Sequence, residues 1–104
     1  MARRIEWTQA AWNDLEQLAE YISKDSAHYA AAFVREVKSA ARSLRTFSER
    51  GRVVPELENP SIREIFVRSY RLIYQVSRKT VFILGFIHGA RDLARLWNDQ
   101  RRRF

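Results

Sequence analysis

The second half of the chain carries side chains that are suited to phosphate chemistry. They are cationic or imidazole groups on segments that we expect to be neighbouring strands, or just after the last of them: Arg63, Arg68, Arg71, His88 and Arg91. Arginine forks match phosphate oxygens bidentately and stabilise the charge that develops in a phosphoryl transition state. An imidazole titrates near neutral pH and can exchange a proton with an RNA hydroxyl. If an antiparallel sheet brings these residues to one region, Arg63, Arg71, His88 and Arg91 form a catalytic set that attacks RNA.

The same residues also have purely structural interpretations. Tyr70 and Tyr74 offer ring faces for stacking, but they alternate with Leu72 as the core residues of a strand do. His88 ends a predicted strand, where an imidazole can hydrogen-bond a backbone carbonyl. Arg91 is followed by Asp92 and can pair with it locally. From the residues alone, both interpretations stay open.

Other enzyme signatures are missing from the sequence. It contains no G-x-x-x-x-G-K-[ST] loop for phosphates, no G-x-S-x-G elbow for a nucleophilic serine and no dinucleotide-binding G-x-G-x-x-G. It has no cysteine, and its two histidines, His28 and His88, are too widely separated to build a metal site unaided. We therefore expect no cofactor and no metal, and any nuclease chemistry would be metal-independent.

Positive charge is concentrated in the second half of the chain. The formal net charge is +7, from 19 Lys and Arg against 12 Asp and Glu. Residues 1–50 hold 8 basic and 7 acidic residues, a balance of +1, whereas residues 51–104 hold 11 and 5, a balance of +6. Sixteen of the 19 basic residues are arginine, which favours a partner rich in phosphate or carboxylate. The alternative is that codon bias supplies arginines that only solubilise the surface.

Length and composition predict one globular domain over residues 1–104. The chain is 46% hydrophobic and 30% charged, which is enough apolar material for a single core. No stretch approaches the roughly 18 apolar residues of a membrane helix. The first arginines are not followed by an apolar run, so we expect neither a signal peptide nor a membrane partner. The absence of cysteine suits a reducing compartment, and we expect a cytoplasmic protein.

The first half of the sequence predicts a strand followed by two helices. Residues 3–7 alternate like a short strand, and Thr8 is placed to cap the helix that follows. The apolar residues of the two helices recur at spacings of three and four: Ala11, Leu15, Leu18 and Ile22, then Ala30, Phe33, Val37, Ala40 and Leu44. Only Lys24, Asp25 and Ser26 separate the helices, with Asp25 or Ser26 as the second cap. The helices should therefore form an antiparallel hairpin.

The second half predicts a meander of strands after an irregular connection at residues 48–59. Strands are expected at residues 62–68 and 70–77, joined by a turn at 77–80 to a third strand. That third strand, Val81 to Ile87, is apolar on both faces, as is typical of a central strand.

A short helix is expected over residues 90–100, with Leu93, Leu96 and Trp97 facing inward, followed by a basic tail. The predicted fold class is thus α+β. An N-terminal strand and an antiparallel helix hairpin pack on an antiparallel sheet of three to four strands, with a short C-terminal helix.

The chain resembles the RelE/ParE superfamily of toxins from bacterial type II toxin–antitoxin systems over nearly its whole length. Besides the opening strand with Trp7 and the helix hairpin, four motifs carry the resemblance. They are Gly51-Arg52-Val53-Val54-Pro55-Glu56-Leu57, Ile62-Arg63-Glu64-Ile65, Tyr70-Arg71-Leu72-Ile73-Tyr74-Gln75-Val76 and Ile87-His88-Gly89-Ala90-Arg91-Asp92. The combination of Y-R-x-x-Y with H-G-x-R-D is its most specific part.

The resemblance implies a toxin that arrests growth, serves plasmid stabilization and is neutralised in a hetero-oligomer by a ParD-like or related antitoxin. Its RelE-like branch cuts messenger RNA in the ribosome, and its ParE-like branch poisons DNA gyrase. His88 followed by Gly89 is more similar to the gyrase branch, because nuclease relatives place a tyrosine or a His-Tyr pair near this end. We therefore expect a gyrase inhibitor that acts by protein binding rather than as an enzyme. The alternative is a ribosome-dependent endoribonuclease, and a third interpretation is a basic nucleic-acid-binding module.

Two sets of residues are expected to make these contacts. The target-binding set combines arginine and aromatic residues, which are common in interface hot spots: Arg68, Tyr70, Arg71, His88, Arg91, Arg95 and Trp97. The antitoxin-binding set is apolar and suits an amphipathic partner: Leu93, Leu96 and Trp97.

Overall fold

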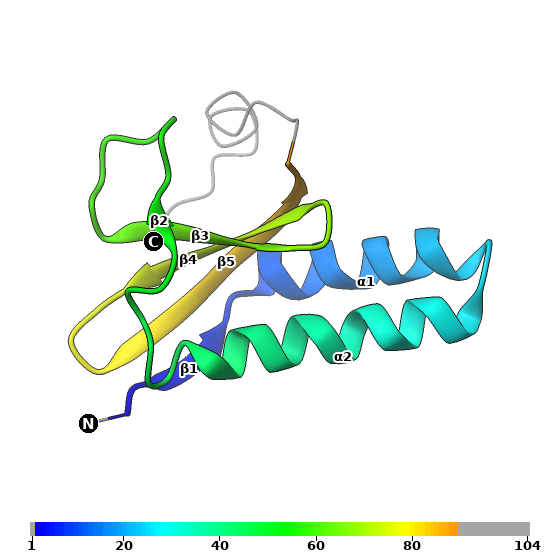
Figure 1. Cartoon of the computed structure of the whole chain (residues 1–104), viewed down its shortest axis with the longest axis horizontal. Coiled ribbons are helices and arrows are strands. Elements are labelled where there is room, and N and C mark those ends of the chain that lie inside the picture. The colour runs from blue at the N-terminus through cyan, green and yellow to red at the C-terminus, as the bar shows by residue number, and fades with distance from the viewer. Residues whose placement is uncertain (1, 90–104) are drawn as a thin grey trace.

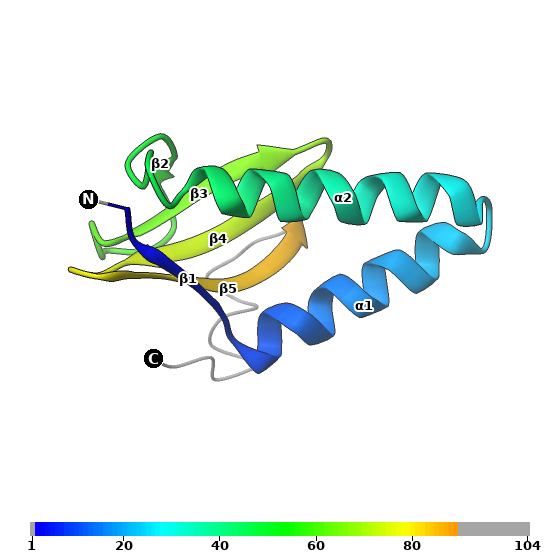
Figure 2. The same ribbon diagram turned by 90° about the horizontal axis from the view of Figure 1, so that it is seen from below.

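The computed structural model describes residues 2–89 and shows two helices on one face of a five-stranded sheet (Figure 1). The elements in chain order are β1 (Arg4–Trp7), α1 (Gln9–Ser23), α2 (Ala27–Ser43), β2 (Arg52–Val53), β3 (Ile62–Val67), β4 (Tyr70–Val76) and β5 (Thr80–His88). The strand order across the sheet is β1-β5-β4-β3-β2. The closed end of the helix hairpin extends past the strands in two perpendicular views (Figures 1 and 2).

Both predicted helix caps are confirmed. The Thr8 hydroxyl oxygen accepts a hydrogen bond from the Ala11 amide at 3.2 Å, and it also donates to the Ile83 carbonyl oxygen at 2.9 Å. One side chain therefore starts α1 and fastens that start to β5. Ser26 caps α2 by accepting a hydrogen bond from the Tyr29 amide at 3.1 Å.

The apolar stripes of the helices form the main core against the sheet, as their spacing predicts. Leu15, Phe33, Val37 and Leu44 are buried there, with Leu18 and Ile22 partly buried at its margin. The sheet side of this core comes from alternate residues of the strands, including Leu72 and Tyr74. This arrangement confirms the α+β fold class and the packing role predicted for Tyr70, Leu72 and Tyr74.

The sheet differs from the prediction in its number of strands and in the direction of one pair. It has five strands rather than three to four, because β2 joins β3 and β1 joins β5. β1 pairs with β5 in parallel, with Ile5 opposite Val81, whereas the other pairs are antiparallel. The direction in which β1 pairs depends on where the helix hairpin places the later strands. The four residues of β1 do not contain that information. β5 lies between β1 and β4, which confirms its predicted central place.

A second, smaller core covers the face of the sheet that points away from the helices. Ile73 and Leu84 are buried there beneath Val54, with Leu57 packed against the cluster. Val54 and Leu57 belong to the connection over residues 48–59, which was expected to be irregular apart from a local extension at Val53 and Val54. The connection therefore acts as a lid on the sheet, and it brings Glu56 with it.

The predicted strand over 62–68 ends one residue early, at Val67. Arg68 has φ 55°, in the left-handed region, and makes the tight turn into β4. A non-glycine residue there costs about 1–2 kcal/mol. The predicted C-terminal helix and basic tail lie outside the described residues.

Candidate functional site

Arg71 is buried among carboxylates on the sheet face that points away from the helices. Its side chain is 4% exposed. Nε donates to Oε1 of Glu64 at 2.7 Å, while Nη1 and Nη2 donate to the two carboxylate oxygens of Glu56 at 2.8 and 2.7 Å. The hydrogen bonds that Arg71 donates to Glu56 raise the pKa of Arg71 against the opposing effect of burial. Arg71 is thus a permanent cation already held by two anions.

Glu64 extends this arrangement to a second arginine. Its side chain is fully buried, and its Oε2 accepts a hydrogen bond from Nε of Arg52 at 2.6 Å. We call Arg52, Glu56, Glu64 and Arg71 the charge network. Its two cations and two anions balance, and they tie β2, β3 and β4 to the lid that carries Glu56. A phosphate could reach Arg71 only by displacing a carboxylate.

His88 lies on the opposite face of the sheet from Arg71. The register places His88 opposite Tyr70 and Ile87 opposite Arg71, and consecutive residues of a strand point to opposite faces. The Tyr70 and His88 rings meet edge to face with centroids 5.7 Å apart, and Tyr70 also packs on Phe33 at 5.4 Å. His88 is exposed at the end of β5 and Tyr70 is half-buried.

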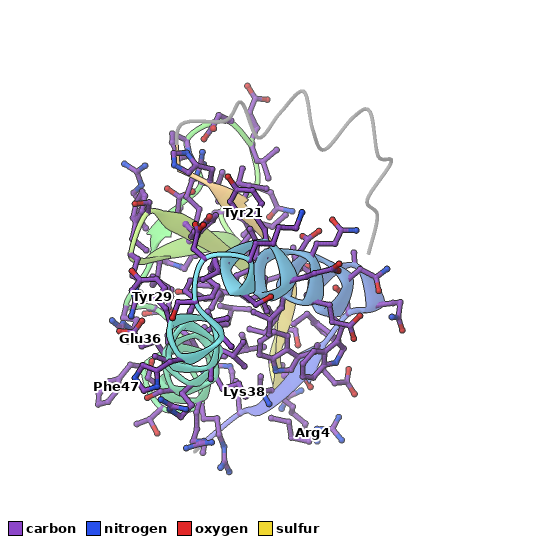
Figure 3. All side chains as sticks on the ribbon, turned by 90° about the vertical axis from the view of Figure 1, so that its right-hand side faces the viewer. Arg4, Tyr21, Tyr29, Glu36, Lys38 and Phe47 are labelled. Carbon is purple, nitrogen blue, oxygen red and sulfur yellow. The ribbon has the colours of Figure 1, made fainter. Side chains whose placement is uncertain are left out.

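Arg68 is directed to α2 rather than to the charge network. Its Nε donates to Glu36 at 2.6 Å, and its guanidinium lies 4.1 Å from the centroid of the Tyr29 ring. The hydrogen bond that Arg68 donates to Glu36 raises the pKa of Arg68. Glu36 and Tyr29 lie on the side of α2 away from β1 (Figure 3). Arg68 lies in the turn that leads into Tyr70, and Tyr70 lies opposite His88. The three residues therefore share one end of the sheet.

Arg63 lies near the other end of β3, opposite Tyr74. Its Nη1 donates to the carbonyl oxygen of Gly51 at 2.7 Å. Tyr74 supports the same segment, because its hydroxyl accepts from the Gly51 amide at 3.0 Å and donates to the Ser48 carbonyl oxygen at 2.8 Å. Tyr74 is four residues from Tyr70, or about 13 Å along a strand.

The structure does not bring together Arg63, Arg71 and His88, the members of the predicted catalytic set that it describes. Arg71 and His88 are on opposite faces of the sheet, and Arg63 is at the far end. The physical reason is strand alternation, since Arg71 follows Tyr70 directly and must point the other way. Tyr70 and His88 are in ring contact, and Arg68 lies in the turn just before Tyr70. The other predicted contact residues, Arg91, Arg95, Leu93, Leu96 and Trp97, fall outside the described residues.

Sequence reasoning missed a cationic groove between β1 and the C-terminal half of α2. We call it the basic groove. It has a volume of about 570 Å³ and its lining combines four cations with apolar residues: Arg4, Lys38, Arg42 and Arg45, with Ile5, Trp7, Trp12 and Ala41. Lys38 projects from the side of α2 that faces β1 (Figure 3). The spacing of Lys38 and Arg42 on α2, and of Arg45 just after it, was visible in the sequence, but the nearness of β1 was not.

Residues 2–89 offer neither a metal-binding cluster nor a membrane-spanning helix. Within that range no group of three or more His, Cys, Asp or Glu side chains is arranged to hold a metal ion. In the same part of the chain no helix is long and apolar enough to span a bilayer.

Comparisons with known proteins agree with this fold. The family model described as "ParE toxin of type II toxin-antitoxin system, parDE" matches residues 5–93. Toxin RelE2 of Caulobacter vibrioides is 34% identical over 89 residues, which are 85% of this chain and 97% of that protein.

Two solved structures share the architecture. One is the chromosomal ParDE toxin–antitoxin system from P. aeruginosa, with a TM-score of 0.69 and 20% identity over 84% of this chain and 96% of that one. The other is the RelBE2 toxin–antitoxin complex from Mycobacterium tuberculosis, with a TM-score of 0.60 and 24% identity over 85% and 99% of the two chains. The family match, the relative and the shared fold lead to one conclusion: this chain belongs to the ParE toxin family of type II toxin–antitoxin systems, within the RelE/ParE superfamily.

Proposed function

We propose that this toxin acts by binding a target protein, DNA gyrase, and that a cognate antitoxin neutralises it. The observation that carries the choice of protein binding over RNA cleavage is the state of Arg71. A nuclease needs free cationic donors beside its proton-transfer group. Here Arg71 is ion-paired with Glu56 and Glu64, and it lies across the sheet from His88.

Energetics support this assignment of Arg71. Removing one partner from a buried ion pair costs about 3–5 kcal/mol, because the other charge is left uncompensated. A phosphate that recruits Arg71 must therefore overcome the pairing with both carboxylates and lift the lid that carries Glu56. The choice of gyrase rests on the H-G-x-R-D ending, which resembles the gyrase branch of the superfamily.

Ribosome-dependent cleavage of messenger RNA is the second candidate function. The match to a toxin named RelE2 and the structural likeness to a RelBE2 complex favour it. Arg68, Tyr70 and His88 also share one end of the molecule, where an imidazole and a ring could meet RNA. That end is common to both candidates as a contact surface, so experiment must separate them.

An antitoxin partner has its own support. Both solved structures of similar fold are described as toxin–antitoxin systems or complexes. If this chain has such a partner, expression of the wild-type chain alone should arrest growth or give poor solubility, and co-expression with the neighbouring gene should restore both. Harmless, soluble, high-level expression of the lone chain would count against the assignment.

The target is tested with purified protein in two parallel reactions. In one, the toxin is mixed with gyrase and relaxed plasmid; in the other, with ribosomes carrying a defined message. We expect loss of supercoiling and cleaved DNA trapped on gyrase, with the message intact. Cuts in the message without any effect on gyrase would overturn the proposal and leave the family membership standing.

A matched pair of histidine variants sharpens this test. His88→Ala and His28→Ala each remove an exposed imidazole, the first at the end of β5 and the second at the start of α2. In a protein-binding toxin we expect His88→Ala to weaken gyrase inhibition by less than about tenfold, because it truncates a single side chain of an extended interface. In a nuclease it should slow RNA cutting by about 10²–10⁴-fold. His28→Ala should change neither activity.

A further inference from the structure

Four cations meet where β1 begins beside the turn that joins β4 to β5. Together with Ala2 they line a cavity of about 290 Å³, and we call them the turn patch: Arg3, Arg4, Arg78 and Lys79. Among the described residues, no acidic side chain lines this cavity. The ion pairs within residues 2–89 neutralise Arg52, Arg68 and Arg71, and none of them involves the turn patch. The patch therefore attracts anions from outside the chain.

The backbone beneath the turn patch is ordered by hydrogen bonds within the chain. The Lys79 carbonyl oxygen accepts from the Arg4 amide at 2.9 Å. The Thr80 carbonyl oxygen accepts from both the amide and the hydroxyl of Ser77, each at 2.9 Å. Nε of Arg3 donates to the Ser77 carbonyl oxygen at 2.9 Å. Three carbonyl oxygens of the turn are thus already paired, while the side chains of Arg4, Arg78 and Lys79 are exposed. A partner meets positive charge on a backbone that needs little further ordering.

The lining of the turn patch suits a phosphate backbone better than a protein surface. Its only apolar side chain is the methyl group of Ala2. Protein interfaces depend on aromatic and large aliphatic anchors, which the basic groove offers in Ile5, Trp7 and Trp12 and the turn patch does not. Nucleic acid backbones are bound by Lys and Arg through charge alone, without an apolar anchor. The composition of the patch therefore matches phosphate.

The turn patch is distant from the surface that carries His88. It lies at the end of the sheet away from the closed end of the helix hairpin (Figures 1 and 2). Thr80 and His88 are the first and last residues of β5, so about 26 Å of strand separates the two surfaces. A target protein that carries DNA can therefore contact the His88 end with its own surface while its DNA reaches the patch.

We propose that the turn patch binds the phosphate backbone of the duplex DNA that gyrase holds. Duplex DNA carries one negative charge per about 1.7 Å of its axis, which is complementary to the exposed cations of Arg4, Arg78 and Lys79. This inference rests on gyrase as the target in the proposed function. It adds that the toxin recognises the complex of gyrase with DNA, through a contact that does not depend on DNA sequence.

The test measures the affinity of the full-length toxin for gyrase with and without linear duplex DNA. Arg78→Glu/Lys79→Glu reverses two charges of the patch at positions that do not line the basic groove. Lys24→Glu/Arg35→Glu makes the same change in net charge at exposed positions outside the patch. We expect DNA to lower the Kd of the wild type and the control by about tenfold or more, and that of the patch variant by less than about threefold.

A neutral variant and a salt series separate lost attraction from added repulsion. Arg78→Ala/Lys79→Ala removes two cations without adding anions, and it should reduce the slope of log K against log salt concentration by about 2 for the complex with DNA. Circular dichroism and thermal unfolding confirm that each variant is folded. An unchanged slope in this folded variant would show that neither side chain contacts phosphate, and would overturn the inference.

The remaining outcomes distinguish the inference from the proposed function. An equal gain from DNA in the wild type, the patch variants and the control overturns the inference while gyrase stands as the target. No binding of the wild type to gyrase, with or without DNA, overturns both. A loss of affinity for DNA-free gyrase in the patch variants as large as that for the complex assigns the patch to an acidic surface of the enzyme and overturns the inference. Binding of polyuridylate that only the patch variants lose, without any gain from DNA on gyrase, assigns the patch to RNA and also overturns it.

Discussion

The charge network and the basic groove use similar cations in opposite ways. In the network, Arg71 is buried and held by Glu56 and Glu64, so its charge is balanced within the chain. In the groove, Arg42 and Arg45 are exposed, and no acidic residue lines the space beside them. The comparison shows that the number of arginines in a toxin says little about its chemistry. What matters is which cations the fold has already neutralised.

The largest effect should come from breaking the network. Arg71→Ala leaves Glu64 buried beside a partner that is itself largely exposed, so we expect a loss of about 3–5 kcal/mol in the free energy of unfolding. Chemical denaturation measures this loss. An effect below about 1 kcal/mol would mean that water or a rearranged Arg52 compensates Glu64, and the contrast with the groove would disappear.

A core substitution provides a reference against which the loss of stability in Arg71→Ala can be compared. Phe33 is fully buried between α2 and the sheet, and Phe33→Ala should cost about 3–5 kcal/mol. Glu16→Ala, on the exposed face of α1, should stay within about 0.5 kcal/mol. Equal effects of these two changes would contradict the helical phase on which the basic groove depends.

Removing the Tyr74 hydroxyl, which holds the connection between α2 and β3, should have an intermediate effect on the free energy of unfolding. Tyr74→Phe removes the hydroxyl that bonds Gly51 and Ser48 inside the protein, which should cost about 1–3 kcal/mol. Gly51 itself leaves no room for change, since an added Cβ would collide with the Glu64 carbonyl oxygen. Urea denaturation of the wild type and Tyr74→Phe measures the difference, and an unchanged midpoint would show that the hydroxyl is not needed.

The same tyrosine predicts a pH dependence. Burial raises the pKa of Tyr74 above its ordinary value near 10. The unfolded chain therefore loses this proton at lower pH than the folded chain, so stability is retained below about pH 10 and falls as pH rises beyond it. Tyr74→Phe should remove that part of the alkaline loss. A stability curve from pH 8 to 11 checks the sign, and identical curves for the two proteins would contradict it.

The smallest effect on stability is expected in the groove. Arg42→Ala/Arg45→Ala removes two exposed cations from a surface without acidic lining residues, so the free energy of unfolding should change by less than about 0.5 kcal/mol per residue. Thermal unfolding compared with the wild type tests this. A loss comparable to that of Arg71→Ala would show that the groove is part of the folded framework and not a free surface.

The parts of the fold that local chemistry determines could be predicted from the sequence. Thr8 and Ser26 cap the helices, and the three–four spacing places Leu15 and Phe33 in the core, because a helix has one periodicity and one buried face. The alternation in β4 likewise predicts that Tyr70 and Tyr74 face the helices.

The candidate site depended on information that local patterns do not contain. Arg71 appeared to be available because its partners, Glu56 and Glu64, are 15 and 7 positions away and meet it only through the lid and the β3–β4 register. The same alternation that places Tyr70 in the core sends Arg71 to the other face, away from His88. The basic groove required the parallel docking of β1, which no residue of β1 specifies.

The central claim is that Arg71 acts within the fold and not on RNA, and an apolar replacement of the buried pair tests it most directly. Exchanging Arg71→Met and Glu64→Leu together, with Glu56→Gln, removes the buried charges without leaving one uncompensated, which is often neutral for stability. The measurement is inhibition of gyrase supercoiling by this variant, beside ribosome-dependent cleavage of a defined message, after its folding has been confirmed. We expect a folded protein that inhibits gyrase within about threefold of the wild type. A folded variant that has lost the toxic activity of the wild type, together with message cleavage by the wild type alone, would contradict it.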